Sequence, residues 1–85
     1  MRIFAAVVHK DLDSAYGISF PDAPGCFSAA DDLDRLVPNA AEALSLYFED
    51  RPVPEPRGLD AVRTEVAADL AEGATLVGIP LLRSL

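Results

Sequence analysis

The stretch that most constrains the fold is residues 17–27, which read Gly-Ile-Ser-Phe-Pro-Asp-Ala-Pro-Gly-Cys-Phe. Pro24 sets φ to about −65° at the second position of a β-turn, and Gly25 supplies the positive φ that the third position of a type II turn requires. Pro21 ends the preceding strand, and Asp22 is expected to cap its own turn by accepting hydrogen bonds from nearby backbone N–H groups. With two prolines the loop loses little conformational entropy on folding, so the sequence predicts a fixed reversal rather than a mobile flap.

The strands expected around this turn are short. Residues 2–9 are apolar on both faces, which is typical of a central strand. Residues 15–20 alternate as a second, antiparallel strand, and residues 26–29 form a third. One face of the second strand is expected in the core: Tyr16, Ile18 and Phe20.

A helix follows the third strand, and the sequence leaves two possible starts for it. Asp32 is a good N-cap for apolar positions that recur at helical spacing. Pro38 conflicts with that start, because a proline in the helix interior deletes a backbone hydrogen bond and clashes with the preceding turn. Either the first turn is irregular, or the helix begins at Pro38 and residues 31–37 form a separate short turn. The stripe expected to pack on the sheet comprises Leu33, Leu36 or Val37, Ala40, Leu44, Tyr47 and Phe48.

The second half of the chain predicts a connector, a helix and a last strand. Residues 51–57 contain three alternate prolines and favour an extended, polyproline-like connector. An apolar stripe that begins at Leu59 predicts a second helix, which Gly73 ends. Residues 74–82 predict the last strand, and Pro80 indicates that its end lies at a sheet edge or leaves the sheet.

Together these elements predict one α+β domain over residues 1–85, because a chain of this length has room for a single core. The expected order is β-β-β-α-α-β, with a small, mostly antiparallel sheet and the helices packed on one face. The core must be built from Ala, Val, Leu and Ile, since the chain has four Phe, two Tyr and no Trp. Stability is therefore expected to draw on self-association.

The charge of the chain disfavours nucleic acid as a partner. Seven basic and fourteen acidic residues give a net charge of −7, and such a surface repels phosphate groups. The longest apolar run, residues 3–8, is far shorter than the ~20 residues that span a bilayer, and the N-terminus lacks the pattern of a signal peptide. We therefore expect a soluble, cytoplasmic protein that binds neither nucleic acid nor a membrane.

No arrangement of residues favours catalysis, a cofactor or a metal ion. Residues 2–9 and the last strand contain no Asp or Glu, so carboxylates cannot gather there around two metal ions. Asp11 and Asp13 belong to a turn, and Asp22 is assigned to its own turn. The single histidine, His9, has no Cys or His at ligand spacing, and the single cysteine, Cys26, is expected to pack beside the turn. No catalytic, cofactor-binding or metal-binding residue is therefore assigned.

The run from Gly17 to Phe27, followed by a helix that contains Glu42-Ala43-Leu44, resembles the N-terminal domain of the HicB family of antitoxins. The resemblance covers most of the chain and implies an incomplete ribonuclease-H-like fold. It also implies a protein that neutralises HicA, a small mRNA-cleaving toxin. Family members commonly continue into a ribbon-helix-helix or helix-turn-helix segment that binds the operator, and we expect no such DNA-binding segment within these 85 residues.

The resemblance gives the acidic surface a partner. A toxin that holds RNA must be basic, so the domain is expected to cover the RNA-binding surface of a HicA-like toxin as an acidic steric plug. The expected toxin-contact residues are Asp31, Asp32, Asp34, Glu42 and Glu49. The tail residues expected to help bury a homo-oligomer interface are Leu81, Leu82 and Leu85. The alternative is a small regulatory or ligand-binding domain of the same fold without a toxin.

Overall fold

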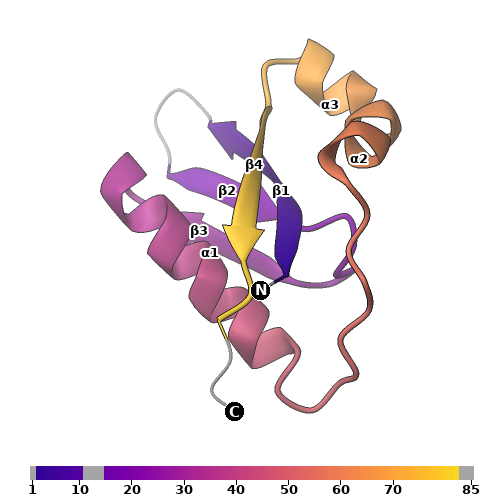
Figure 1. Cartoon of the computed structure of the whole chain (residues 1–85). Helices are drawn as coiled ribbons and strands as arrows, with labels where there is room; N and C mark the ends of the chain where they lie inside the picture. Colours follow the sequence, from indigo (N-terminus) through magenta and orange to yellow (C-terminus); the bar gives the residue numbers. More distant parts are fainter. Residues whose placement is uncertain (1, 11–14, 83–85) are drawn as a thin grey trace.

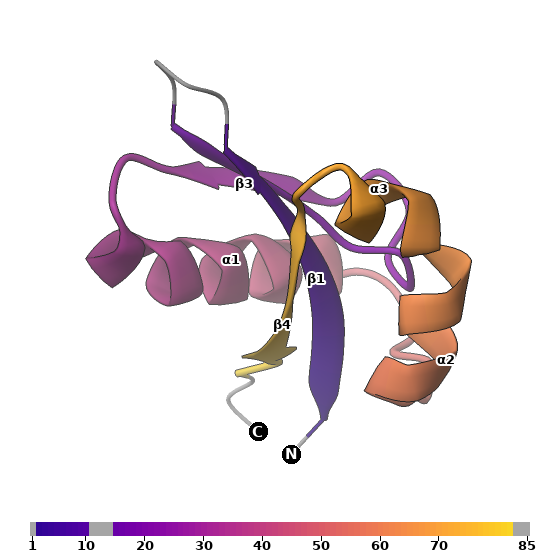
Figure 2. The same ribbon diagram turned by 90° about the horizontal axis from the view of Figure 1, so that it is seen from above.

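The computed structural model describes residues 2–10 and 15–82, which form a twisted four-stranded sheet with helices on both sides (Figures 1 and 2). All pairings are antiparallel, and the strands lie in the order β3-β2-β1-β4. The strands are β1 (Ile3–Lys10), β2 (Tyr16–Ser19), β3 (Phe27–Ala30) and β4 (Thr75–Pro80). The helices are α1 (Leu33–Tyr47), α2 (Leu59–Glu65) and α3 (Ala67–Ala71). The predicted α+β class is confirmed, although the second predicted helix is divided in two at Val66.

The position of β1 explains where the helices lie. β1 pairs with β2 on one side and with β4 on the other, so it is central, as its apolar sequence predicts. Because side chains alternate along a strand, Phe4, Ala6 and Val8 face α1, while Ala5 and Val7 face the opposite side. The prediction that the helices pack on one face is wrong. A strand that is apolar on both faces needs packing elements on both faces of the sheet. α1 buries one face, and α2 and α3 bury the other.

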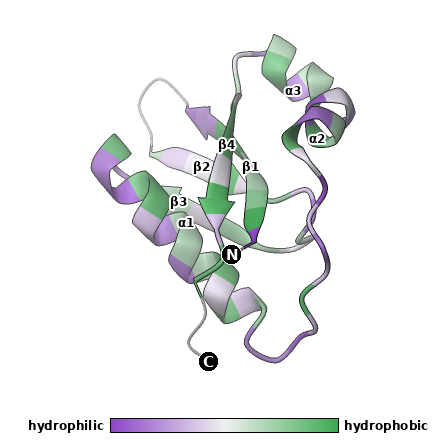
Figure 3. Ribbon diagram, in the orientation of Figure 1, coloured by the Kyte–Doolittle hydropathy of each residue, from purple (hydrophilic) through white to green (hydrophobic). Residues whose placement is uncertain are grey.

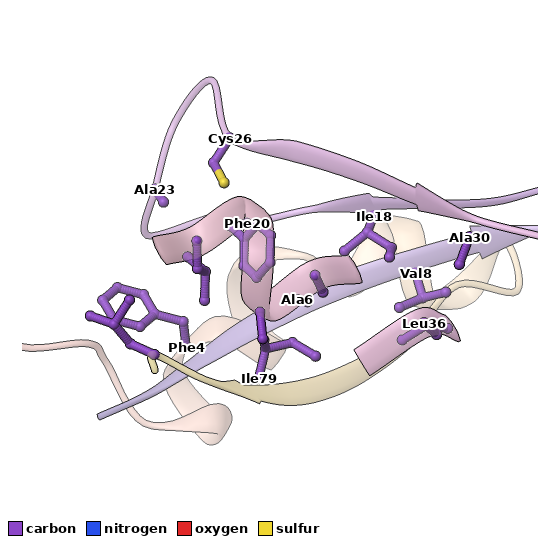
Figure 4. Packing of buried hydrophobic residues seen from close by; sticks show 14 of the residues in the cluster. Phe4, Ala6, Val8, Ile18, Phe20, Ala23, Cys26, Ala30, Leu36 and Ile79 are labelled. Carbon is purple, nitrogen blue, oxygen red and sulfur yellow. The ribbon is translucent and has the colours of Figure 1, made fainter. Parts of the chain in front are cut away.

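The main core lies between the sheet and α1 (Figure 4). Ile18 and Phe20 are buried there and Tyr16 packs against them, which confirms the predicted core face of β2. From the C-terminal end of the helix, Leu44 and the C-cap residue Phe48 pack into this core. No buried polar side chain was found among the described residues. Apolar burial on this side therefore holds α1 to the sheet.

Helix α1 begins at the first of its two possible starts. The carboxylate of Asp32 accepts a hydrogen bond from the backbone N–H of Arg35 at 3.0 Å, and the helix continues through Pro38. A start at Pro38 is therefore wrong. Asp34, whose carbonyl oxygen the proline cannot bond, and Pro38 itself are both exposed, so water can satisfy that carbonyl group. Leu33 is exposed as well, so the predicted packing stripe does not extend to the first turn.

Two glycines have the positive φ that their predicted turns require. Gly25 has a φ of 89°, and the N–H of Cys26 donates to the carbonyl of Ala23 at 3.0 Å, as expected for the Pro-Gly turn. Gly73 has a φ of 104° and ends α3, while Ala74 donates its N–H to the carbonyl of Asp69 at 3.0 Å. This last bond closes the C-terminal motif that favours glycine at that position.

The remaining segments follow the sequence analysis closely. Residues 52–58 have no regular secondary structure, as the alternate prolines predict. The other predicted strands differ from the observed ones by one or two residues at their ends. None of the helices in the described ranges combines the length and the apolarity needed to cross a membrane.

Candidate protein-interaction surface

The acidic residues predicted to contact a toxin are distributed along α1. Asp31 and Asp32 lie at its N-terminal end, Asp34 in its first turn, Glu42 in its middle and Glu49 just beyond its C-terminal end, and all five are exposed. At 3.6 residues per turn, Asp34 and Glu42 lie about 80° apart around the axis, on the side away from the sheet. The structure therefore brings these residues to one side of the helix but spreads them along its length.

Asp32 also has a structural role, as the N-cap of α1. Its carboxylate caps the helix, so one of its oxygens is engaged by the N–H of Arg35. A negative side chain at this end also interacts favourably with the helix dipole. Of the five acidic residues, Asp32 is therefore the one whose substitution would disturb the fold itself.

An apolar residue in this acidic surface escaped the sequence analysis. Leu46 is 63% exposed, four residues after Glu42 and three before Glu49, so it lies between them on the helix surface. The sequence indicated its exposure only in that Leu46 does not belong to the apolar stripe expected to pack on the sheet. The side chains of Glu42, Leu46 and Glu49 form what we call the α1 outer surface, and exposed Arg35 adds one positive charge to the same side.

The Pro-Gly turn is tied to the connector by ionic bonds. The carboxylate of Asp22 accepts hydrogen bonds from the backbone N–H of Arg57 at 2.9 Å and from its Nε at 2.7 Å. The same guanidinium group donates to Glu65 of α2 at 2.7 and 3.2 Å. The prediction that Asp22 caps its own turn is therefore wrong. Its partner lies thirty-five residues away, where sequence spacing gave no sign of it.

This group of charges affects the titration of Glu65. Hydrogen bonds from Arg57, together with its positive charge, hold the pKa of the Glu65 carboxyl below its ordinary value. The same bonds to Glu65 and Asp22 raise the pKa of Arg57. Both side chains are substantially exposed, so we treat the group as an anchor for the connector and not as a chemical site.

The turn also holds the end of α1. The hydroxyl of Tyr47 donates to the carbonyl of Pro24 at 2.7 Å, and the guanidinium of Arg51 lies over the Tyr47 ring, 4.2 Å from its centre. Pro21, Pro24 and Gly25 thus hold a rigid turn that contacts both the helix and the connector. Two backbone hydrogen bonds close the turns at these residues, from the N–H of Ala23 to the carbonyl of Phe20 and from the N–H of Cys26 to the carbonyl of Ala23.

Neither of the two residues with the greatest chemical reactivity lies in a reactive setting. Burial raises the pKa of the Cys26 thiol, which points into the main core (Figure 4). His9 Nε2 lies 3.8 Å from the Asp69 carboxylate on α3. Within the described ranges, no three His, Cys, Asp or Glu side chains converge as metal ligands would; Asp11 and Asp13 lie outside those ranges.

One hollow lies on the far side of the sheet from α1. Its volume is about 330 Å³, and the exposed ring of Phe27 forms one wall. It is lined by His9, Gly17, Ile18, Ser19, Phe27 and Ser28. His9, Ser19 and Ser28 are polar, and none of the lining residues is a carboxylate, a lysine or an arginine.

The three tail leucines differ in their environment. Leu81 is buried in the main core of its own chain, so its side chain cannot also contribute to an oligomer interface. Leu82 is exposed, and its carbonyl accepts a hydrogen bond from Ser45 of α1 at 2.7 Å. Leu85 lies outside the described residues. The prediction is therefore wrong for Leu81 and stays a prediction for Leu82 and Leu85.

Comparison with known proteins assigns the fold to a family. The model of a family described as "HicB_like antitoxin of bacterial toxin-antitoxin system" matches residues 4–77, which include every helix and most of the sheet. The chain belongs to the HicB-like antitoxin family. A UPF0150 protein of Archaeoglobus fulgidus is 44% identical to this HicB-like chain over 46 residues, which are 54% of this chain and 67% of the archaeal protein.

Solved structures agree with the family. The HicB antitoxin of Burkholderia pseudomallei superimposes with a TM-score of 0.73 at 26% identity, and the match covers 94% of this chain. The HicB-like chain spans 63% of the length of that antitoxin. A chain of the "HicA3 and HicB3 toxin-antitoxin complex" has the same fold, with a TM-score of 0.73 at 24% identity over 92% of this chain and 95% of that one.

Proposed function

We propose that this HicB-like domain neutralises a HicA-like, mRNA-cleaving toxin by binding it through the α1 outer surface and covering the surface that holds RNA. The observation that carries the proposal is an exposed leucine between two acidic residues, Glu42 and Glu49, on a chain with a net charge of −7. An RNA-cleaving protein must bind a phosphate backbone, so its binding surface is basic. The complex of HicA3 and HicB3, whose chain shares this fold, supports the same class of partner.

The arrangement on α1 suits such an interface. Protein interfaces combine a dry apolar centre with a polar rim, and a few central residues supply most of the binding energy. Leu46 provides an apolar centre, and the neighbouring carboxylates provide a rim of one sign. Opposite charge on the toxin would accelerate encounter and orient the two proteins. The domain then inhibits by occupying the RNA-binding surface, which requires no catalytic residue of its own.

The proposal is tested with the product of the reading frame adjacent to the gene of this chain. The two proteins are purified together, and RNA cleavage by the toxin is measured with and without the domain. We expect a stable complex and no cleavage. Absence of both a complex and a cleaving toxin would overturn the proposal in favour of a regulatory or ligand-binding domain.

A charge reversal locates the surface. The double variant Glu42→Lys/Glu49→Lys is expected to slow association and weaken toxin binding by about tenfold or more, because it reverses the field of the α1 outer surface. The matched control is Asp60→Lys/Glu72→Lys, which makes the same change of net charge at exposed positions of the α2–α3 layer. Equal loss of affinity in both variants would show that net charge alone matters and would contradict the assignment to α1.

A further inference from the structure

The hollow on the far side of the sheet from α1 is built by strand pairing. His9 on β1 pairs with Gly17 on β2. Ser19, two residues farther along β2, pairs with Phe27 on β3. Residues that pair across antiparallel strands, and residues two apart along one strand, point to the same face of a sheet. These four residues therefore share the face opposite α1, where they line the hollow of about 330 Å³.

Phe27 gives this hollow an aromatic wall. Among the large apolar residues that the structure describes, Phe27 is the most exposed, at 70%. The residue paired with it, Ser19, is too small to cover the ring, and α2 and α3 cover only the part of this face around Ala5 and Val7. The ring therefore offers an apolar, electron-rich surface to a group that enters the hollow.

Gly17 is a strand glycine that the fold itself does not require. It has no positive φ, and a Cβ at this position would come no closer than 4.0 Å to an atom beyond its chain neighbours, the carbonyl oxygen of His9. Gly78 of β4 differs, because a Cβ there would lie 2.9 Å from Cγ2 of Ile3. A glycine weakens a strand, and one that its neighbours do not demand often marks a place that another group approaches closely. At Gly17 that place is the floor of the hollow.

The charge beside the hollow is negative. His9 Nε2 lies 3.8 Å from Oδ1 of Asp69 on α3, so a half-exposed carboxylate lies next to one wall. Residues 58–73 carry four acidic side chains and one basic one, and in Figure 3 purple residues lie on α2 and α3, whereas most of β2 is pale. Lys10 points to the other face, where its Nζ lies 5.1 Å from the centre of the Tyr16 ring. The hollow therefore has hydrogen-bond acceptors beside it, and its lining contains no lysine or arginine.

We propose that this hollow binds the guanidinium group of an arginine that a basic protein partner presents. The planar group lies flat on the backbone of Gly17, with its positive charge against the ring of Phe27. Its N–H groups donate to the hydroxyl oxygen of Ser19 and to the carboxylate of Asp69. The aromatic wall, the bare floor and the neighbouring acceptors are then all used by one side chain.

The same features disfavour other occupants. A nucleic acid is repelled by a chain with a net charge of −7. An apolar side chain would remove water from Ser19 and Asp69 without donating a hydrogen bond to either. The ammonium group of lysine is compact and strongly hydrated, so it stacks less well than a guanidinium group. The hollow and the α1 outer surface lie on opposite sides of the sheet, so this site is independent of the proposed toxin contact.

The test titrates the whole chain with two short peptides and follows its backbone amides by NMR. One peptide carries a single arginine between glycines, and the other carries citrulline, which has a similar shape but no charge. We expect saturable shifts of the Gly17 and Phe27 amides with the arginine peptide, and binding of the citrulline peptide that is weaker by about tenfold or more. An arginine peptide that gives no saturable shift up to about 10 mM, or a citrulline peptide that binds equally well, would overturn the proposal.

Substitutions locate the bound group. Gly17→Val fills the hollow with a residue that strands favour, so the variant should fold and lose the arginine peptide. Phe27→Leu keeps an apolar side chain at an exposed position but removes the ring, and it should weaken binding by a few-fold. Asp69→Asn should also weaken binding, whereas the matched control Glu72→Gln, at the end of α3, should not. Unchanged peptide binding in folded Gly17→Val and Phe27→Leu variants would contradict the site.

Toxin binding by the same variants separates this site from the proposed function. Gly17→Val should bind the toxin as the wild type does, because the α1 outer surface is unchanged. A Gly17→Val variant that loses toxin binding as strongly as Glu42→Lys/Glu49→Lys would overturn the proposal of a separate partner, since the hollow would then belong to the toxin contact. Loss of the arginine peptide alone, with toxin binding intact, would support a second interaction site.

Discussion

The two sides of the sheet are covered by layers of very different construction. Of the described residues, the α1 side buries fifteen in one continuous cluster, which includes the large side chains Phe4, Phe48 and Leu44. The α2–α3 side buries four: Ala5, Val7, Val62 and Val66. The first layer is a fifteen-residue helix, and the second consists of helices of seven and five residues.

The difference shows two ways to hold a helix on a sheet. Helices as short as α2 and α3 are not stable alone, so tertiary contacts must supply their stability. Buried Val62 and Val66 and partly buried Leu70 provide the apolar contact of these helices. The ionic bonds of Arg57 to Asp22 and Glu65 fix the connector where it enters α2. We therefore expect the α1 layer to set global stability and the α2–α3 layer to open locally.

The largest effect is expected in the α1 layer. Leu44→Ala removes a fully buried side chain from the main core and should lower the free energy of unfolding by about 2–5 kcal/mol. Denaturant unfolding measures the change, with the exposed residue of the same helix, Leu46→Ala, as the control. Equal losses at both positions would contradict the assignment of the core.

The next largest effect is expected in the α2–α3 layer. Val62→Ala removes two methyl groups from a fully buried position and should cost about 2 kcal/mol from transfer and cavity terms. Amide exchange should accelerate in α2 and α3 but not in α1, because the layer opens separately. Uniform acceleration throughout the chain would show instead that the two layers unfold as one unit. Leu59→Ala, at a half-exposed site of the same helix, should change little.

A smaller effect is expected at the junction of α3 with β4. Gly73→Ala forces a residue with a Cβ to adopt a φ of 104° and should destabilise the chain by about 1 kcal/mol. Gly58→Ser is the control, because Gly58 has a φ of −66°, open space around its Cα and the N-cap position of α2, where serine is favoured. Thermal unfolding should show a loss for Gly73→Ala and none for Gly58→Ser; the reverse order would contradict the backbone geometry.

The smallest effect depends on pH. Because the pKa of Glu65 is lower in the folded than in the unfolded chain, its bonds to Arg57 stabilise the protein above the unfolded-state pKa. That stabilisation disappears as the pH falls through the folded-state pKa. Glu65→Gln should therefore melt below the wild type at pH 7, and the difference should shrink on acidification. The control is Glu72→Gln, which makes the same substitution at an exposed glutamate at the end of α3.

Local chemistry explains what the sequence could predict. Pro24 and Gly25 specify their turn, Asp32 its helix cap and Gly73 its helix end, because each depends on residues within one turn of the chain. The central position of β1 was predictable because a strand that is apolar on both faces requires two neighbours and two covers. The same reasoning, carried one step further, would have placed helices on both faces.

The errors concern contacts between distant segments. The bond from Asp22 to Arg57 joins residues that only the folded connector brings together. The exposure of Leu33 and Val37 depends on where the sheet ends relative to α1, and helical spacing does not contain that information. Leu81 is likewise buried in a core built from distant segments, and its N–H donates to the carbonyl of Arg2, near the other end of the chain. Of the candidate surface, the charges could be read from the sequence, whereas Leu46 required the fold.

The pairing of β1 with β4 has a consequence for synthesis. It joins Ile3 to Pro80, so among the elements of this domain the central strand is synthesised before the others and its last neighbour after them. Until then, a strand that is apolar on both faces lacks one complete side of its hydrogen-bonding ladder. Such non-local closure is slow and leaves nascent chains open to aggregation. Translation that stops before Thr75 would therefore yield a polypeptide unable to complete its sheet, however correct its turns and its first helix.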